Sequence, residues 1–562
     1  MFVSPMSDPM HDVIRKYALQ NAVFFKGAAN PKSVVGKVLG ECPEFRSRSA
    51  EIISMADDIV ASVNRMSLED QTKELQTLDS NLMVKEKKER THELPPLDGA
   101  DKGVVMRIAP GPSGPLHIGH SRVSVLNDEY VKRYGGTLIN RFEDTNPEKI
   151  APEAYDMIPE DLEWLGVKIH KTVMQSDRFE IYYDITKKLI SGGTAYVCTC
   201  NADEWRDLKE NMRACPCRGL SEEEQSERYD RLLSNGYGEG EAIAVVKTDL
   251  RHPNPAVRDF VALRIVDHPH PRVGSKYNVY PMMNLSVAID DHLMGMTHVI
   301  RGKDHLNNTF RQEYIYRHMG WKTPHFHHYG LVSIPDSVLK TSLIKEGIAG
   351  SEYAGWDDVR TGTLRAMKKR GIRPEAIRRY WVESGMKPID IQFTWENLYA
   401  MNRDIIDGEA NRYFFVADPV EFDIFGAKEI TGKAPLHPDH PERGTRDYSL
   451  SGDISVSISS QDVDDFEKKG MVRLKDLCNI EYGKPAAYAG TDLSVLKKGV
   501  RVIQWVSSGI PAELHMPDGT ILKGMTESAI SKEKGSTVQF ERVGFARIEK
   551  NDDSVLAIFT HR

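Results

Sequence analysis

The sequence predicts a multidomain protein with a parallel α/β core, a helical N-terminal extension and an all-β C-terminal part. At ~150 residues per domain, a chain of 562 residues is too long for one hydrophobic core. Residues 103–144 have the pattern strand, Gly-rich loop, helix, strand. After about residue 411, helical periodicity fades and short alternating runs take its place.

The composition is that of an ordinary globular protein. Apolar residues make up 40% and charged residues 28%, which excludes a disordered or collagen-like chain. There are 74 Lys plus Arg against 82 Asp plus Glu, a net charge of −8. The chain therefore cannot bind nucleic acid through overall charge, and any polyanion must meet local basic patches.

The sequence predicts a cytoplasmic protein without a membrane partner. No apolar run approaches the ~18 residues that span a bilayer. Residues 1–15 lack the apolar centre of a signal peptide. Four of the 6 Cys fall in one short stretch, which does not fit a secreted disulfide framework.

The first hundred residues are predicted to be mostly helical. Apolar residues recur at helical spacing in HDVIRKYALQNAVFF and EIISMADDIVASVNRM. The stretch VKEKKERTHELPPLDGADKG is charged and then rich in Pro and Gly, so a linker is expected to end near residue 102.

A βαβ unit is predicted next. KGVVMRIAP is a β-branched strand candidate, SRVSVLNDEYVKRY an amphipathic helix closed by Gly135 and Gly136, and TLINRFED the second strand. A parallel sheet binds its ligand in the crevice at the carboxyl ends of its strands. The loop GPSGPLHIGH is expected to lie there.

The pattern is helical again from about 360 to 410, and the tail is predicted to form one or two small β-barrels. Pro374 fits the first turn of a helix through Trp381. Strand-like runs follow in GDISVSISS, KGVRVIQWV, STVQFERVGFARI and VLAIFTHR. A basic cluster near the helix fits a solvated face or a contact with an RNA backbone: Arg370, Arg373, Arg378 and Arg379.

The strongest functional signal is Pro-Ser-Gly-Pro-Leu-His-Ile-Gly-His at residues 112–120. A helix N-terminus carries free backbone N–H groups that suit phosphates. His117 and His120 can donate to charge that develops on a phosphate, and Gly119 allows close approach of an adenine ring. An isolated H-x-x-H would more often be a cap or core feature, but the flanking strand and helix favour function. No third ligand lies nearby for zinc.

Four cysteines form two C-x-C pairs separated by fourteen residues: Cys198, Cys200, Cys215 and Cys217. Four thiolates suit tetrahedral zinc, although the usual pair spacing is wider. Reduced structural cysteines and a redox role remain open. His437 and His440 lie among prolines, which favours an irregular loop over a metal site.

Several segments together resemble the class I aminoacyl-tRNA synthetases of the glutamate/glutamine branch, and within it the archaeal-type glutamyl-tRNA synthetases. They are RIAPGPSGPLHIGH, RFEDTNPEK, YPMMNLSVAIDDHLMGMTHVIRGKDH, GIRPEAIRRYWVESG, WENLYAMNRDIID, PLHPDHPERG and QFERVGFARIE. The resemblance covers nearly everything from residue 100 to the end.

The resemblance implies a Rossmann-type catalytic core and a fixed order of domains. They are a helical N-terminal extension (1–100), the first half of the catalytic domain (101–195), an acceptor-binding insertion with the Cys cluster (196–280), the second half with a KMSKS-like loop (281–350), a helical stem-contact region (351–410) and β-barrels that bind the anticodon (411–562).

The implied reaction has two steps. Glutamate and ATP, with Mg²⁺ on the phosphates, form glutamyl-adenylate, and the glutamyl group passes to the 3′ end of tRNA(Glu). The resemblance leaves open whether tRNA(Gln) is charged too, and it implies a monomer. The Cys cluster would hold a structural Zn²⁺.

The resemblance also assigns residues. His117, His120 and Lys345 would be catalytic, and the ATP-binding set adds Gly119 and Lys340. The glutamate-binding set would be Arg107, Ala109, Glu143 and Arg301. A guanidinium suits a carboxylate through paired hydrogen bonds. Arg107, Glu143 and Arg301 could instead form structural salt bridges.

The sequence departs from the family at two positions. Met283 stands where relatives usually have a substrate-contacting Tyr. The family's Lys-Met-Ser-Lys-Ser loop corresponds to Lys340-Thr341-Ser342-Leu343-Ile344, so Leu343 replaces the second lysine. Lys345 or Lys340 would then supply the charge, unless they are ordinary loop lysines.

Three other functions stay open. A glutaminyl enzyme would be closely similar, although Ala109 and GIRPEAI favour the glutamyl side. Leu343 and Met283 raise the alternative of a non-catalytic RNA-binding paralogue. A small nucleotidyltransferase also uses an HxGH-type loop, but the long β-rich tail argues against it.

Overall fold

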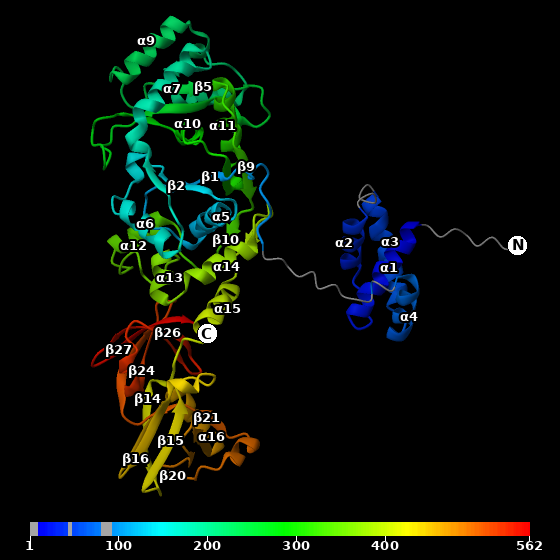
Figure 1. The fold of residues 1–562 in the computed structure, drawn as a ribbon, viewed down its shortest axis with the longest axis vertical. Helices are drawn as coiled ribbons and strands as arrows, with labels where there is room; N and C mark the ends of the chain where they lie inside the picture. The colour runs from blue at the N-terminus through cyan, green and yellow to red at the C-terminus, as the bar shows by residue number, and fades with distance from the viewer. Residues whose placement is uncertain (1–8, 43–47, 80–81, 83–92) are drawn as a thin grey trace, which may run out of the picture. The chain divides into compact units, whose positions relative to one another are not determined.

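The computed structural model describes residues 9–42, 48–79, 82 and 93–562. The chain divides into a helical unit, Met1–Thr91, and a main unit, His92–Arg562. The charged part of the predicted linker, residues 84–92, lies outside the described residues. Figure 1 shows the helices of the first unit and the mixed helices and strands of the main unit.

The helical unit confirms the helical prediction for its described residues. It consists of α1 (Pro9–Phe24), α2 (Pro31–Glu41), α3 (Ser49–Val63) and α4 (Leu68–Leu78). Two polar caps begin helices: Asn30 accepts from the Ser33 N–H, and Ser67 accepts from the Asp70 N–H. Apolar side chains from all four helices form one core.

The predicted βαβ unit is present in the main unit. Strand β1 (Val104–Ile108) leads through the His-containing loop to α5 (Ile118–Tyr134), and β2 (Gly136–Phe142) follows. The strands are parallel, with Arg107 opposite Ile139. Gly136 has positive φ, and a Cβ there would lie 1.9 Å from the Val104 carbonyl oxygen, so only glycine fits this crossing.

The catalytic sheet continues on both sides of this unit. Strand β3 (Lys171–Met174), reached through α6 (Ala154–Trp164), pairs in parallel with β2. On the other side β8 (His298–Gly302) pairs in parallel with β9 (His325–Tyr329). Three hydrogen bonds between Val105 and Thr297 join β1 to the start of β8. The order β3-β2-β1-β8-β9 reverses between β1 and β8, where such sheets bind ligands.

An insertion with its own antiparallel sheet lies between the two halves of the core, and α10 and α11 belong to the second half. The sheet has the order β4-β5-β6-β7. The helices and strands of the insertion are α7 (Phe179–Ser191), β4 (Ala195–Cys198), α8 (Ala202–Glu210), α9 (Glu222–Leu233), β5 (Ile243–Val246), β6 (Phe260–Ile265) and β7 (Val279–Pro281). The chain re-enters the core through α10 (Met283–Leu293) and continues after β8 with α11 (Leu306–Met319).

Four helices follow the core: α12 (Thr341–Ala349), α13 (Leu364–Arg370), α14 (Pro374–Ser384) and α15 (Trp395–Ile406). Two short strands, β10 (Val332–Ser333) and β11 (Ile391–Gln392), pair in parallel beside them. Pro374 occupies the first turn of α14, as predicted.

The predicted basic cluster is divided between mostly buried and exposed arginines: Arg370 and Arg378 hold the helices to the rest of the domain, while Arg373 and Arg379 lie at the surface, where they pair with nearby carboxylates. Arg370 ends α13, is buried and donates to the Thr560 carbonyl at 2.8 Å. Arg378 donates to Asp128 at 2.6 Å. Their neighbours pair with carboxylates as well: Arg373 with Glu409, and Arg379 with Glu383 and Asp404. These guanidinia mainly hold the helices to their surroundings.

The all-β prediction for the tail is confirmed, apart from α16 (Ser460–Lys469). Two seven-stranded sheets have the orders β12-β25-β26-β27-β23-β24-β13 and β21-β18-β19-β20-β14-β17-β22, and β15 pairs with β16. The strands are β12 (Arg412–Tyr413), β13 (Phe415–Ala417), β14 (Pro419–Phe425), β15 (Glu429–Pro435), β16 (Thr445–Ser451), β17 (Ile454–Ser459), β18 (Met471–Leu474), β19 (Asn479–Glu481), β20 (Ala486–Tyr488), β21 (Arg501–Ile503), β22 (Trp505–Val506), β23 (Gly509–His515), β24 (Ile521–Glu527), β25 (Thr537–Phe540), β26 (Gly544–Asn551) and β27 (Val555–His561). Each sheet encloses its own apolar core.

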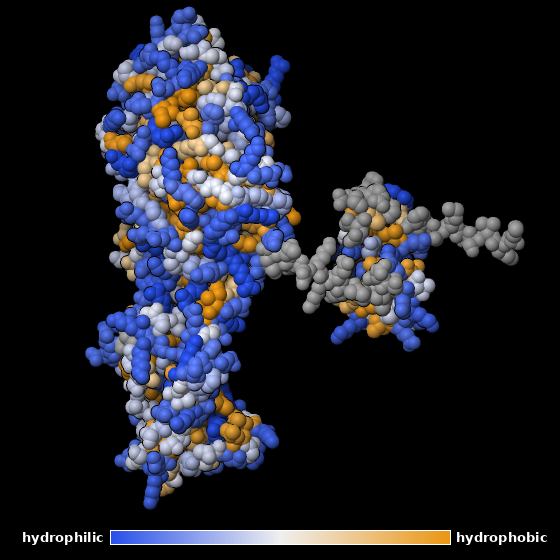
Figure 2. Space-filling model, viewed as in Figure 1, coloured by the Kyte–Doolittle hydropathy of each residue, from blue (hydrophilic) through white to orange (hydrophobic). Residues whose placement is uncertain are grey.

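Hydrophilic and hydrophobic residues are mixed over the face of the main unit that Figure 2 shows. In the described residues, no helix combines the length and the apolar character needed to cross a bilayer. The interpretation of His437 and His440 as loop residues is confirmed: His437 is buried and contacts the Asp407 carbonyl at 2.9 Å, and His440 contacts Glu442.

Candidate functional site

A cavity of about 390 Å³ lies at the carboxyl ends of β1, β2 and β8. Its lining includes every residue predicted to bind glutamate, together with both histidines and Gly119 of the His-containing motif: Arg107, Ala109, His117, Gly119, His120, Glu143 and Arg301. Residues separated by almost two hundred positions thus meet at the point where the strand order reverses. Their individual roles remain predictions.

The two histidines form a reciprocal cap at the start of α5. His117 Nδ1 accepts the N–H groups of Gly119 at 3.0 Å and of His120 at 3.3 Å. His120 Nδ1 accepts the His117 N–H at 3.4 Å. Because each Nδ1 is an acceptor, the neutral rings carry their proton on Nε2, which leaves two N–H donors.

The surroundings keep both rings neutral. Their centroids lie 3.6 Å apart, so two positive charges would repel each other strongly. Desolvation and the neighbouring His120 lower the pKa of His117 to about 2. His120 is open to solvent at the cavity, yet the protein atoms crowded around it lower its pKa to about 4.

Gly119 is required by the geometry of the cap. A Cβ at this position would lie 2.9 Å from Cε1 of His117 and 3.5 Å from Ile334. Any other residue would therefore push the His117 ring out of its place.

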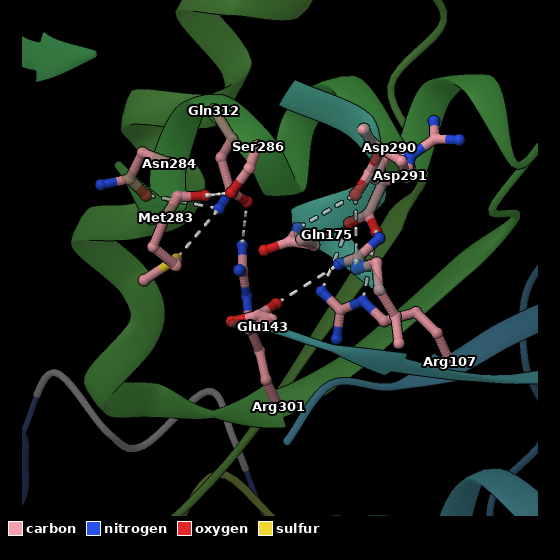
Figure 3. A network of polar contacts seen from close by, with 12 residues as sticks. Arg107, Glu143, Gln175, Met283, Asn284, Ser286, Asp290, Asp291, Arg301 and Gln312 are labelled. Carbon is pink, nitrogen blue, oxygen red and sulfur yellow. Dashed lines mark hydrogen bonds and ion pairs between the residues drawn. The ribbon is translucent and has the colours of Figure 1, made fainter. Parts of the chain in front are cut away.

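A network of buried charges forms the floor of the cavity (Figure 3). Arg107 contacts Asp291 through two hydrogen bonds of 3.2 and 3.3 Å. Arg141 donates to the same carboxylate at 2.6 Å and to Glu143 at 3.4 Å. Burial raises the pKa of Glu143 despite the two guanidinia nearby.

A second carboxylate on α10, Asp290, extends the network. It accepts hydrogen bonds from Gln175, Arg178 and Tyr182 at 2.7–3.0 Å. It is therefore fully satisfied and fixes α10 beside the cavity.

Arg301 differs from the other guanidinia of the cavity. It is 6% exposed, and its Nη2 donates to the neutral groups Thr309 Oγ1 and Gln312 Oε1. Its Nε has no hydrogen-bond partner, and no carboxylate of the described residues lies within 4 Å. Desolvation lowers its pKa to about 10. Arg301 thus lines the cavity as a buried cation that has no carboxylate partner among the described residues, and Figure 3 shows it beside Gln312.

Met283, predicted above to depart from the family, lines the cavity. Its Sδ lies 3.9 Å from Nε2 of Gln312, a weak contact. Gln312 also bonds Asn284 at 3.3 Å. The thioether thus contacts the same amide that orients Arg301 (Figure 3).

Lys340 and Lys345 do not line the cavity. Both are exposed, and in the described part of the chain neither forms an ion pair. The segment predicted as a loop forms the first turns of α12, with Leu343 49% exposed. The first residue of α12 packs against the His-containing loop, because a Cβ on Gly114 would lie 2.2 Å from the Thr341 side chain.

Sequence reasoning missed Arg141, Asp290, Asp291 and Gln312. A signal for the carboxylates existed: Asp290 and Asp291 are adjacent in a helix whose other buried residues are mostly apolar. Two neighbouring buried carboxylates require cationic partners. Gln312 gave no comparable signal, because its role depends on β8 and α11 lying side by side.

The four cysteines of the insertion converge. Their Sγ atoms all lie within 4.8 Å of one another, and none forms a disulfide. Cys198 and Cys215 are 3.7 Å apart, and Cys200 and Cys217 are 3.8 Å apart. A Zn–S bond of ~2.3 Å in a tetrahedron requires sulfur atoms ~3.8 Å apart, so the set fits zinc. Arg228 donates to Cys217 Sγ at 3.3 Å and would neutralise thiolate charge.

Comparison with known proteins gives two matching domain families. "tRNA synthetases class I (E and Q), catalytic domain" matches residues 103–408, and the corresponding "anti-codon binding domain" matches residues 410–494. Three similar curated proteins are named glutamate–tRNA ligase. The protein from Methanocorpusculum labreanum is 49% identical and covers 97% of this chain and 98% of its own length. The protein from Methanoculleus marisnigri is 48% identical and covers 97% of this chain and 98% of its own length. The protein from Methanocaldococcus jannaschii is 47% identical and covers 98% of this chain and 100% of its own length.

Proposed function

The chain belongs to the class I tRNA synthetases for glutamate and glutamine, and from this premise we propose that it is a glutamate–tRNA ligase. It activates glutamate with ATP to glutamyl-adenylate and pyrophosphate. It then transfers the glutamyl group to the 3′ end of tRNA(Glu). The archaeal-type relatives match it over nearly its full length.

The observation that carries the choice of glutamate is the charge of Arg301. Arg107 and Arg141 already face Asp291 and Glu143, whereas Arg301 has no anionic partner in the described part of the chain. A desolvated guanidinium gains more from a carboxylate than from a carboxamide, because the pair is charge-assisted and neutral overall. The geometry therefore supports an acidic amino acid over glutamine.

The histidine end of the cavity suits the nucleotide. The substrate carboxylate attacks the α-phosphate, so the enzyme needs no nucleophile of its own. Its contribution is to position the reactants and to stabilise charge on the phosphate. The Nε2–H groups of His117 and His120 are neutral donors for that purpose. ATP enters with Mg²⁺, which supplies positive charge at its phosphates.

Lys340 and Lys345 are proposed to meet the phosphates when ATP is bound. They stand outside the cavity, on the segment that contacts Gly114 of the His-containing loop. A small displacement of that segment would bring a lysine toward the nucleotide and would compensate for Leu343.

The Cys cluster is proposed to hold one structural Zn²⁺ that stiffens the insertion against the tRNA acceptor end. Four cysteine ligands leave no coordination position for water. The β-barrels bind the anticodon, and the protein acts as a monomer in the cytoplasm.

ATP–pyrophosphate exchange with glutamate or glutamine, with and without tRNA, tests the activity. We expect exchange with glutamate and none with glutamine. Exchange only with glutamine would overturn the choice of substrate, and exchange under no condition would favour an RNA-binding paralogue. Charging of both purified tRNAs decides whether tRNA(Gln) is a substrate.

A further inference from the structure

Hydrogen bonds hold the backbone on both sides of His117. The Leu116 carbonyl accepts the Leu364 N–H at 2.8 Å, and the Ile118 N–H donates to the Gly362 carbonyl at 3.0 Å. The Leu116 N–H is held by a side chain instead of the backbone: it donates to Asp161 Oδ2 at 2.8 Å. Asp161 thus anchors the backbone at the residue that precedes His117.

Asp161 occupies a position where an apolar residue would be expected. It lies on α6, is 3% exposed, and shares the buried face of the helix with Ile158, Leu162 and Leu165. Its other oxygen, Oδ1, lies 3.3 Å from Arg365 Nε. Burial raises the pKa of Asp161 to about 7, although the Leu116 N–H and Arg365 both oppose that shift. The carboxylate therefore costs folding free energy, which argues that it is retained for another purpose.

We propose that Asp161 is a positioning residue for adenylate formation, which holds the Leu116 peptide so that His117 points its Nε2–H into the cavity. The proposal rests on the function proposed above. Asp161 itself does not line the cavity, so it acts only through the loop. A misplacement of ~1 Å at a group that contacts the transition state typically costs on the order of 100-fold in rate.

The chain offers a matched control in Asp128. This carboxylate is also buried, accepts a backbone N–H (Lys168, 3.0 Å) and pairs with an arginine (Arg378, 2.6 Å). It lies in the second half of α5, ten residues from Ile118, and does not line the cavity. If Asp161 had only a structural role, substitution of either aspartate would be expected to change kcat alike.

The test compares D161N and D161L with D128N and D128L, using ATP–pyrophosphate exchange in the presence of tRNA. D161N keeps an acceptor oxygen for the Leu116 N–H, so its kcat is expected within about threefold of the wild type. D161L removes the acceptor at similar volume, and its kcat is expected to fall on the order of 100-fold with the KM for glutamate little changed. D128L is expected to lose stability but to keep its kcat.

Hydrogen exchange at the Leu116 amide supplies a readout that does not depend on activity. Faster exchange in D161L than in D128L, with D161N like the wild type, supports the proposal. Equal kcat losses in D161L and D128L, a loss confined to the KM for glutamate, or unchanged Leu116 exchange would overturn it. If the leucine variants do not fold, D161A and D128A replace them. Absence of exchange activity in the wild type would contradict the proposed function, while the amide measurement would still decide the role of Asp161.

Discussion

Arg107 and Asp291 face each other in a two-point ion pair, with Nε 3.2 Å from Oδ1 and Nη2 3.3 Å from Oδ2. The pair links β1 to α10 across the two halves of the catalytic domain. Since Asp291 already neutralises the charge of Arg107, Arg107 orients a substrate more than it attracts one. The attraction for a negative charge then comes from Arg301, which pairs with no carboxylate among the residues that the structure describes.

The first prediction follows from this difference. R301Q is expected to raise the KM for glutamate on the order of 100-fold, since charge-assisted hydrogen bonds contribute ~1.5–3 kcal/mol each. The KM for ATP is expected to change less than about threefold, because Arg301 lies at the amino-acid end. Steady-state pyrophosphate exchange measures both constants.

R231Q, which removes an arginine in α9 of the insertion, is the control for lost charge. Equal effects of R301Q on the two substrates would argue against the assignment. R107A is a less clear experiment, because it also leaves the buried Asp291 without one of its partners.

The second prediction concerns the histidine pair. H120A is expected to reduce adenylate formation ~100-fold or more, because a donor to the phosphate is lost, while tRNA affinity stays nearly unchanged. H268A, in an exposed loop of the insertion, is the control. A parallel collapse of tRNA binding would mean that His120 supports the fold instead of the reaction.

A third prediction follows from the low pKa values of the same rings. Since these are about 2 for His117 and about 4 for His120, both imidazoles stay neutral from pH 8 to 5.5. Nitrogen NMR is expected to show two Nε2–H tautomers that do not titrate in this range. In the unfolded chain both rings protonate near 6.5. Their contribution to stability is therefore full above pH 6.5 and falls as the pH drops toward 4. Titration of either ring near pH 6.5 would contradict the stacked, desolvated arrangement.

The sequence predicted the elements of the site better than their connections. The strand, loop and helix around His117 follow from local patterning, since β-branched residues and a capping motif act within a few positions. The ion pair of Arg107 with Asp291 spans 184 positions, and it requires the sheet to be assembled before the partners meet. Leu343 shows the same limit in another form. A family loop was expected there, whereas local helix propensity makes it the first turn of α12.

The fourth prediction is a zinc content of about one ion per chain, with C215S reducing it to near zero. The sulfur distances of 3.7 and 3.8 Å already match a tetrahedral site. Removing zinc with a chelator is expected to destabilise the insertion, since metal-binding free energy is folding free energy here. Elemental analysis and thermal denaturation measure the two effects. C42S, outside the cluster, is expected to keep its zinc. A reduced, stable cluster without metal would contradict the site.

The last prediction uses two buried aspartates whose pKa values shift in opposite directions. Burial raises the pKa of Asp161 to about 7. The positive charges of Arg365 and Lys368 oppose this shift, and the negative charge of Glu160 adds to it. Burial acts on Asp128 too, but hydrogen bonds from Lys132, Lys168 and Arg378 lower its pKa overall. Between pH 4 and 7 the unfolded chain has released the Asp161 proton while the native state keeps it, so stability falls as pH rises.

D161N is therefore expected to gain stability over the wild type from pH 5 to pH 8, on the order of a few degrees in Tm. D128N is expected to lose stability, because Asp128 stabilises as a carboxylate and keeps that contribution across this range. Thermal unfolding of D161N and D128N at pH 5 and pH 8 measures both effects. If the gain in Tm of D161N over the wild type became smaller as the pH rises, Asp161 would be an ordinary ionised carboxylate.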